Sequence, residues 1–321
     1  MRTTRTRALL AALAASLVGL GTAAVPAPAS AAPATWTVRV GSQSANMAVQ
    51  GMRFLPGEVT VDAGDTVTWR AGSAEIHTVT FFPGGGPQTS LPPFDPGDLS
   101  QLTQQGGSTY DPAQYFSSGL MTTVPSGGDV GPLPPVPHVQ SYSLTFPEEG
   151  TFTYYCLVHG LMMVGTVHVQ AAGTPYPYTQ RQYDEQARLM AAGLLADGQS
   201  LRRELWRRST MHRVFLGGDD DAVALMRFIR PHVVVRVGQE VVFKNVGLGA
   251  PHTVTFGEEP PPPDLFGPSG DPAHYRGGAL SSGILPPGSR FTVTFTRPGR
   301  YRYVCALHDS MGMVGTVVVR R

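Results

Sequence analysis

The stretch YRYVCALHDSMGMVGTVVV, residues 301–319, has a second version in the same chain, FTYYCLVHGLMMVGTVHV, at residues 152–169. In both, aromatic residues alternate with other residues up to a cysteine, a short loop follows, and the chain leaves as a run rich in valine. Alternation of this kind is typical of half-buried β-strands. The sequence therefore predicts one strand–loop–strand unit that is present twice.

Each loop carries side chains that bind soft metal ions. Cys156 and Cys305 are the only cysteines, and each is followed three positions later by a histidine, His159 or His308. A methionine stands seven or eight positions after each cysteine. Thiolate, imidazole and thioether together form a ligand set that suits copper.

A second histidine for each set stands upstream, inside another repeated string. EIHTVTF supplies His77, and APHTVTF supplies His252. Two histidines, one cysteine and a weakly bound methionine describe a blue-copper (type 1) electron-transfer site. Because the same split pattern occurs twice, we expect two such sites, each holding one copper ion.

A disulfide bond between Cys156 and Cys305 is the alternative, and an exported protein would permit it. Such a bond explains neither the histidine after each cysteine nor the duplicated methionine. The other five histidines lie outside the repeated ligand pattern, and we expect none of them to bind copper. They are His138, His168, His212, His232 and His274.

Residues 1–31 have the features of an export signal. Three arginines precede the apolar run ALLAALAASLVGLGTAAV, and Ala-Ser-Ala at 29–31 fits a small-residue cleavage site. No twin arginine precedes the run, which favours Sec-type export with cleavage near Ala31. We therefore expect a secreted or extracytoplasmic protein with no membrane span after cleavage.

The duplication extends beyond the metal loops. MRFLPGEVTVDAGDTVTW at 52–69 matches MRFIRPHVVVRVGQEVVF at 226–243. In the first of these segments, strands are expected at 58–62 and 66–70, separated by the turn at 63–65. Short alternating strands with Gly and Pro turns favour an all-β fold, an antiparallel β-sandwich. A whole domain is therefore repeated.

Two sandwich domains, 32–170 and 211–321, are expected on either side of a short helical connector at 171–210. Apolar residues recur at helical spacing over 179–209, and Gly198 is expected to divide this segment into two helices or to kink it. The connector should pack on the sandwiches.

The two domains differ in loop content and in charge. The excursion at 84–137 is rich in Gly, Pro, Ser and Thr, so we expect mostly irregular surface structure, with a lid or a partner contact as the functional alternative. The first domain holds 3 arginines against 10 acidic residues, and the second holds 12 basic residues against 9 acidic ones. Opposite charge favours docking of the domains on each other or on different partners.

Both halves resemble the cupredoxins, the group of plastocyanin, pseudoazurin and azurin, over nearly all of 36–170 and 211–321. The resemblance rests on Gly-Asp-Thr-Val-Thr-Trp at 64–69, the two His-Thr-Val-Thr-Phe strings and the Cys-x-x-His…Met-Val-Gly-Thr-Val loops. It implies two Greek-key β-sandwiches, each with copper held at one end. The implied ligands are His77, Cys156, His159 and Met163 in the first domain, and His252, Cys305, His308 and Met313 in the second.

The resemblance also favours one of two neighbouring methionines in each loop, although the first loop departs from the plastocyanin spacing by one residue and Met162 stays the alternative to Met163 there. In cupredoxins the axial methionine stands two residues before the glycine that opens the last strand, which points to Met163 and Met313. Met162 and Met311 would then pack against the loop. Tyr155 stands where plastocyanin-like proteins place a tyrosine on the electron exit route, whereas the second domain has valine there.

These patterns together predict an electron carrier that passes single electrons between redox partner proteins, which the sequence does not identify. A copper carrier or buffer is the first alternative, because it would use the same ligands. A two-domain copper oxidase or nitrite reductase would add His-x-His pairs, and the chain has none, so we expect no enzyme activity. A nucleic acid partner is not expected, since no basic stripe with interleaved aromatic residues is found.

Overall fold

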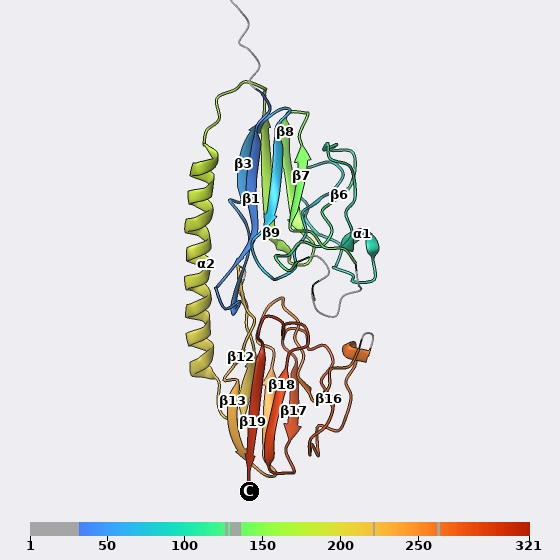
Figure 1. The fold of residues 1–321 in the computed structure, drawn as a ribbon, viewed down its shortest axis with the longest axis vertical. Helices are drawn as coiled ribbons and strands as arrows, with labels where there is room; N and C mark the ends of the chain where they lie inside the picture. The colour runs from blue at the N-terminus through green and yellow to red at the C-terminus, as the bar shows by residue number, and fades with distance from the viewer. Residues whose placement is uncertain (1–31, 126–127, 129–135, 221, 262–263) are drawn as a thin grey trace, which may run out of the picture.

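The computed structural model describes residues 32–125, 128, 136–220, 222–261 and 264–321. Two β-sandwiches lie end to end along one long helix, and the second carries the C-terminus (Figure 1). The expected export signal at 1–31 lies outside the described residues. Within the described ranges, no helix is long and apolar enough to cross a membrane.

The first sandwich is built mainly from the N-terminal half of the chain. Its elements are β1 Thr35–Gln43, β2 Val49–Leu55, β3 Glu58–Asp62, β4 Thr66–Ala71, β5 Thr80–Phe81, α1 Leu99–Leu102, β6 Phe116–Ser117, β7 Ser141–Thr145, β8 Gly150–Cys156 and β9 Gly160–Gln170. One sheet has the order β3-β9-β8-β5-β6, and the other contains β2-β1-β4-β7.

The second sandwich follows the helix α2 Gln180–Arg208. After α2 the chain forms β10 Arg213–Leu216, β11 Val223–Leu225, β12 Phe228–Ile229, β13 His232–Arg236, β14 Glu240–Lys244, β15 Thr255–Phe256, the 3₁₀ helix η1 Asp264–Phe266, β16 Leu280–Ser281, β17 Arg290–Thr294, β18 Gly299–Val304 and β19 Val314–Arg320, and all of these except β11 belong to the second sandwich. Its sheets have the orders β12-β10-β14-β17 and β13-β19-β18-β15-β16.

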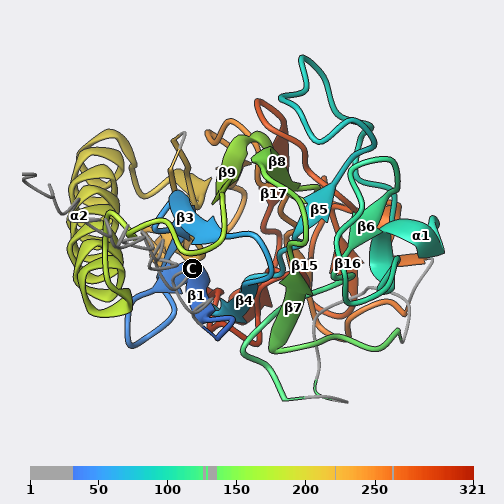
Figure 2. The ribbon, with the colours of Figure 1, turned by 90° about the horizontal axis from the view of Figure 1, so that it is seen from above.

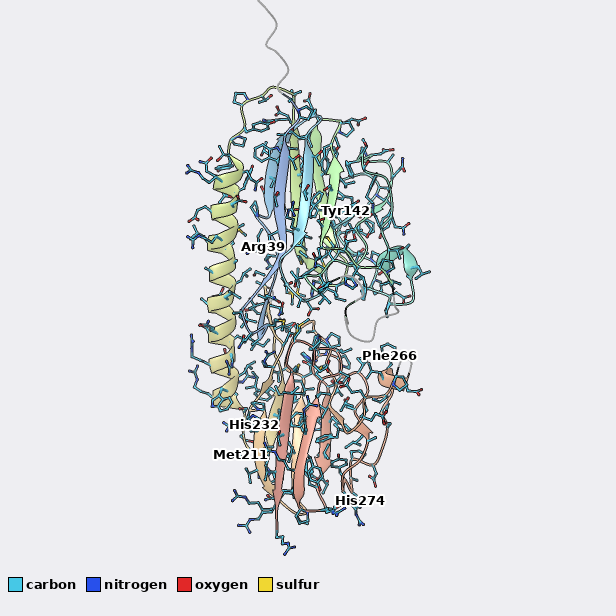
Figure 3. The ribbon with its side chains drawn as sticks, viewed as in Figure 1. Arg39, Tyr142, Met211, His232, Phe266 and His274 are labelled. Carbon is cyan, nitrogen blue, oxygen red and sulfur yellow. The ribbon has the colours of Figure 1, made fainter. Side chains whose placement is uncertain are left out.

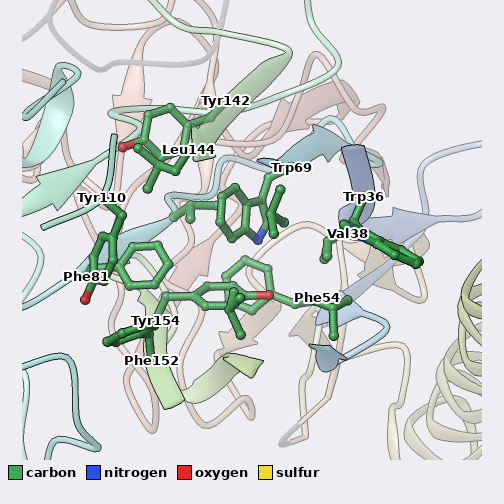
Figure 4. Packing of buried hydrophobic residues seen from close by; sticks show 14 of the residues in the cluster. Trp36, Val38, Phe54, Trp69, Phe81, Tyr110, Tyr142, Leu144, Phe152 and Tyr154 are labelled. Atoms are coloured by element: carbon green, nitrogen blue, oxygen red, sulfur yellow. The ribbon is translucent and has the colours of Figure 1, made fainter. Parts of the chain in front are cut away.

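The two cores repeat one aromatic arrangement. In the first core, Phe54 packs edge-on against Tyr154 with ring centroids 4.6 Å apart, and Trp69 lies 5.1 Å from the same tyrosine (Figure 4). In the second core, Phe228 and Tyr303 repeat the first pair at the same 4.6 Å. Such edge-to-face pairs add to the stability that burial of large rings already gives. The duplication seen in the sequence is therefore a duplication of packing.

The sheets are mixed, whereas the strand pattern predicted a purely antiparallel sandwich. Four pairs are parallel: β1 with β4, β3 with β9, β10 with β14 and β13 with β19. The turn at 63–65 does not close a hairpin, because β3 and β4 lie in opposite sheets. Strands that are not joined by a hairpin can pair in parallel through a longer crossover connection. The strand positions themselves, 58–62 and 66–71, agree with the prediction.

One strand from the C-terminal half lies in the first sandwich. Val223, Ala224 and Leu225 of β11 pair antiparallel with β2, which extends that sheet to five strands in the order β11-β2-β1-β4-β7. The expected domain range of 211–321 placed this strand in the second domain. An edge strand with unpaired backbone groups is a ready partner for another strand, and β11 covers that edge of β2.

The connector forms one continuous helix, so the expected division at Gly198 is wrong. Thr179 caps its N-terminus in a capping box with Gln182. A Cβ atom at Gly198 would lie 2.3 Å from Cγ1 of Val49, so the glycine allows close packing of α2 on β2 and does not end the helix. Figure 2 shows α2 along one side of the stacked sheets.

A small cluster rich in methionine lies between the two sandwiches. Its buried members are Met52, Ala74, Ala224, Met226 and Met311. Arg227 adds a polar link, because its Nη2 donates a hydrogen bond to the backbone carbonyl of Asn46 in the other half. The sandwiches therefore meet through an apolar cluster and a polar link beside it.

Candidate metal centres

The first candidate centre lies at the end of the first sandwich that faces the second. Cys156 ends β8, His159 stands in the turn before β9, and His77 precedes β5. The Sγ atom of Cys156 lies 3.2 Å from Nδ1 of His159 and 3.8 Å from Nδ1 of His77. The structure thus brings His77 close to Cys156, which lies 79 positions later in the sequence, and to His159 beside it.

The second candidate centre repeats this geometry. Sγ of Cys305 lies 3.4 Å from Nδ1 of His308 and 3.7 Å from Nδ1 of His252. In the described part of the chain, these two His/Cys/His groups are the ones whose potential ligand atoms converge, all within 4.8 Å of one another.

The spacing of these atoms fits a bound metal ion. An ion held about 2.3 Å from sulfur and about 2.0 Å from nitrogen in near-tetrahedral geometry keeps those ligand atoms roughly 3.5 Å apart. The sulfur–nitrogen separations in the two centres range from 3.2 to 3.8 Å. Both cysteines are free, so the alternative of a Cys156–Cys305 disulfide is wrong for this structure.

Backbone and hydroxyl groups hold each cysteine in the same way. The backbone N–H of Thr78 donates to Sγ of Cys156 at 3.4 Å, and that of Thr253 donates to Sγ of Cys305 at 3.3 Å. The hydroxyl of each threonine accepts a 2.8 Å hydrogen bond from the residue after the cysteine. The repeated His-Thr string therefore supplies one candidate ligand and also a hydrogen bond to the cysteine sulfur.

One histidine has a partner that its counterpart lacks. Ser73 Oγ lies 2.9 Å from Nε2 of His77, which leaves Nδ1 of that ring facing Cys156. Among the described residues, no hydroxyl bonds Nε2 of His252; this atom faces Gly217, where an added Cβ would lie 3.0 Å away. The two centres are therefore similar but not identical.

Burial keeps the histidines neutral and the free thiols protonated. It lowers the pKa of His159 and His308 to about 4. It lowers the pKa of His77 and His252 well below the ordinary value, and for these two residues the neighbouring histidine lowers the pKa further. Burial raises the pKa of both cysteines to about 11. Neutral imidazoles bind metal directly, whereas each thiol must first lose its proton.

The methionines divide between the cores and the interface. Met163 and Met313 are fully buried, each in the same apolar cluster as the cysteine of its half. Met311 belongs to the cluster between the sandwiches, and Met162 lies against Gly249 of the other half. Met163 and Met313 thus share the buried cores with the two cysteines, whereas Met162 and Met311 lie at the junction of the two halves.

Glu75 is a residue near both centres that sequence reasoning missed. Its Oε1 lies 3.9 Å from Nε2 of His159, and its Oε2 lies 4.0 Å from Nε2 of His308. Burial raises the pKa of this carboxyl to about 7. A difference between the two repeated strings could have pointed to this residue, because Glu75 stands two residues before His77 whereas Ala250 stands two residues before His252.

The remaining histidines lie away from both centres. His168 is paired with Glu58 at 3.2 Å, and His274 with Asp271 at 3.1 Å. Figure 3 shows His232 and His274 on the second sandwich, away from the junction. Nε2 of His138 forms a hydrogen bond with the backbone carbonyl of Pro125, and Nδ1 of His212 forms one with the backbone carbonyl of Glu240.

The excursion at 84–137 contains the short elements α1 and β6 and covers Tyr155. The backbone N–H of Gln88 donates a 2.6 Å hydrogen bond to the phenolic oxygen of Tyr155, which is 2% exposed. The tyrosine beside Cys156 therefore lies beneath this excursion and not at the open surface.

The chain is similar to known copper proteins. A model of the family "copper binding proteins, plastocyanin/azurin family" matches residues 214–320. Plastocyanin from Rumex obtusifolius is 34% identical over 105 residues, which are 33% of this chain and 96% of that protein. The chloroplastic major plastocyanin isoform of Arabidopsis thaliana is 37% identical over 108 residues, 33% of this chain and 58% of that protein.

A solved structure, reduced auracyanin from Roseiflexus castenholzii, is 21% identical with a TM-score of 0.25 and covers 34% of this chain and 95% of that one. The plastocyanin match spans almost the full length of the Rumex protein. This chain therefore belongs to the plastocyanin/azurin family of copper-binding proteins.

Proposed function

We propose that this protein is a blue-copper electron carrier with two type 1 sites, one in each sandwich. The observation that carries the proposal is the duplicated His/Cys/His cluster, together with a buried methionine in the same apolar core as each cysteine. The proposed ligands are His77, Cys156, His159 and Met163 in one site, and His252, Cys305, His308 and Met313 in the other. Copper held by such a set supplies a one-electron couple.

The chain itself contributes a prearranged, water-poor ligand set. The histidines are neutral and buried, and hydrogen bonds from Thr78 and Thr253 already point at the two sulfur atoms. Ligands fixed before the metal binds need little movement when the charge at the site changes. That property suits electron transfer better than metal delivery, in which ligands must open to release the ion.

A copper carrier or buffer stays the second candidate, since it would use the same residues. The low exposure of the proposed ligands favours the electron carrier over the copper carrier. The side chains of His159 and His308 are only 13% and 8% exposed. A site that hands copper to another protein needs a ligand within that protein's reach. An oxidase or nitrite reductase is disfavoured by the lack of His-x-His pairs in the sequence.

We further propose that the protein works outside the cytoplasm, where the segment 1–31 would direct it. Its electron donor and acceptor are proposed to be other proteins. Because the two ligand histidines turn toward the domain junction, we expect such partners to dock elsewhere on the sandwiches.

The experiment is a metal count with a visible spectrum on the full chain reconstituted with Cu²⁺. Two copper ions per chain and an intense thiolate-to-copper band are expected. The double variant Cys156→Ser/Cys305→Ser is the control and should show no such band. Reversible one-electron reduction and oxidation of the loaded protein would separate the electron carrier from a buffer, which need not cycle.

A further inference from the structure

Glu75 occupies an unusual place in the molecule, because one carboxylate lies between ligand residues of both centres. Its two oxygens are divided between them: Oε1 faces Nε2 of His159 at 3.9 Å, and Oε2 faces Nε2 of His308 at 4.0 Å. Because the oxygens of one carboxylate are roughly 2 Å apart, the two Nε2 atoms are at most about 10 Å from each other. One side chain therefore bridges the gap between the centres.

The carboxylate of Glu75 is buried away from solvent, and one of its oxygens has no hydrogen-bond partner to replace water. Glu75 is 6% exposed, and its Oε2 is buried with no hydrogen-bond partner in the described structure. A buried polar atom left unpaired destabilises the fold, and it does so more strongly when the group is charged. Such an atom in a native fold calls for an explanation.

The ligand histidines supply the explanation. Nδ1 of His159 and Nδ1 of His308 face the cysteine sulfurs, at 3.2 and 3.4 Å. A metal ion bound at Nδ1 leaves the ring proton on Nε2, so Nε2–H becomes a donor. Histidines that bind metal almost always give that second N–H to a carboxylate, a carbonyl or water. Here both Nε2 atoms lie within 4.0 Å of the same carboxylate.

We propose that Glu75 is a positioning residue shared by the two metal centres, accepting a hydrogen bond from Nε2–H of His159 on one oxygen and from Nε2–H of His308 on the other. This inference rests on the proposed function, since it takes the two His/Cys/His groups as metal sites. It adds that the centres are coupled through one side chain at the domain junction. Each centre thereby depends on a residue that also serves the other.

The surroundings leave room for these bonds to form. Glu75 and His308 line two cavities at the junction, of about 420 and 230 Å³, and His159 lines the smaller one. Each separation exceeds an ordinary N–H···O hydrogen bond by about 1 Å, so one bridging water on each side completes the link between Glu75 and the two histidines. The two oxygens serve different histidines, so the bonds do not compete.

The test measures metal affinity in full-chain variants that keep one centre each, Cys305→Ser for the first and Cys156→Ser for the second. Binding of Co²⁺ against a competing chelator is followed by its thiolate absorption. Glu75→Leu should weaken binding about 10- to 100-fold in both backgrounds, the size typical of a lost outer-shell partner. Glu75→Gln keeps an oxygen acceptor and should restore part of the affinity in both.

Reduction potentials of the copper-loaded one-site variants give a readout that simple loss of packing does not produce. A carboxylate that accepts from a ligand N–H makes the imidazole a better donor and favours the more highly charged oxidised ion. Glu75→Leu should therefore raise the potential of both sites, and Glu75→Gln should raise each by less.

Two substitutions serve as matched controls. Ser73→Ala removes a partner of His77 alone, so it should weaken the first centre and leave the second unchanged. Glu58→Gln alters a carboxylate that pairs with the exposed His168, and it should change neither centre.

An effect of Glu75→Leu on one centre only, or on neither, would overturn the proposal. If the one-site variants with native Glu75 bind no metal at all, the proposed function itself fails, so the two failures are distinguishable. Should Glu75→Leu not fold, the Glu75→Gln potentials decide the matter alone, because unchanged potentials at either site contradict a shared acceptor.

Discussion

Gly165 lies so close to Tyr154 that an added Cβ atom would approach the Cζ atom of the ring to 2.3 Å. The second sandwich repeats the contact, with a Cβ on Gly315 only 2.2 Å from Cζ of Tyr303. Each glycine stands two residues after the proposed methionine ligand. The Met-Val-Gly string therefore serves packing as well as the metal site, because the missing side chain lets the aromatic ring reach the last strand.

Gly165→Ala and Gly315→Ala should each lower the free energy of unfolding by about 1–3 kcal/mol or more, since adding atoms to a packed core usually costs that much. Denaturant unfolding followed by fluorescence would measure the loss. Gly193→Ala is the control: this glycine lies in α2 with no atom within 4 Å of an added Cβ, so the change should be neutral or stabilising by up to about 1 kcal/mol. Equal stability of all three variants would contradict the packing argument.

Cys156→Ser and Cys305→Ser should each remove one half of the visible thiolate-to-copper absorption and one bound copper. The two sulfurs lie in separate clusters, each with its own pair of histidines, so neither substitution removes a ligand of the other centre. Absorption spectra and metal analysis of the single variants check the prediction. Loss of all colour from either single change would show a site shared between the domains.

Metal binding should release one proton from each centre in alkaline solution. The pKa of each cysteine thiol is raised to about 11, so below that pH the free protein holds a proton that the metal must displace. Apparent affinity should therefore rise about tenfold per pH unit at each site. An ordinary thiol, with a pKa of 9.0, would lose this dependence above pH 9.

The informative window is pH 8 to 10. The carboxyl of Glu75, with a pKa of about 7, is already ionised there and adds no proton of its own. Chelator-buffered Co²⁺ titrations in this window should show an undiminished slope up to pH 10. A slope that flattens from pH 9 onward would contradict the effect of burial on the thiols.

The two converging His/Cys/His clusters could be predicted from sequence because their pattern is local and repeated. Cys156 and His159 are three residues apart on one loop, and the matching string in the second half marked the corresponding residues there. The strand at 58–62 was predicted for a similar reason, since its alternation is visible in five residues.

Features that depend on contacts between distant segments could not be predicted in this way. Gly198 was expected to interrupt the helix, yet its contact with Val49 across the helix–sheet interface decides its role. The pairing of β11 with β2 and the position of Glu75 both depend on how one half packs on the other. No repeat pattern marks these two features, because neither has a counterpart in the other half of the chain.

The two centres should have different reduction potentials. Met163 lies within β9, four positions after His159, whereas Met313 stands before β19, five positions after His308, and donates its N–H to the carbonyl of that histidine at 3.1 Å. The thioether is therefore presented differently in the two sites, and axial contact is a main control of the potential.

Two further differences act in one direction. The first half carries net negative charge and the second net positive charge, and a negative surrounding resists the gain of an electron. Ser73 also supports His77, whereas no hydroxyl among the described residues supports His252, and a supported ligand favours the oxidised ion. Both differences should make the reduction potential of the second site higher than that of the first. Voltammetry of Cys156→Ser, which keeps the second site, should give a higher reduction potential than voltammetry of Cys305→Ser, which keeps the first. Coincident potentials would contradict the prediction and favour a duplicated buffer.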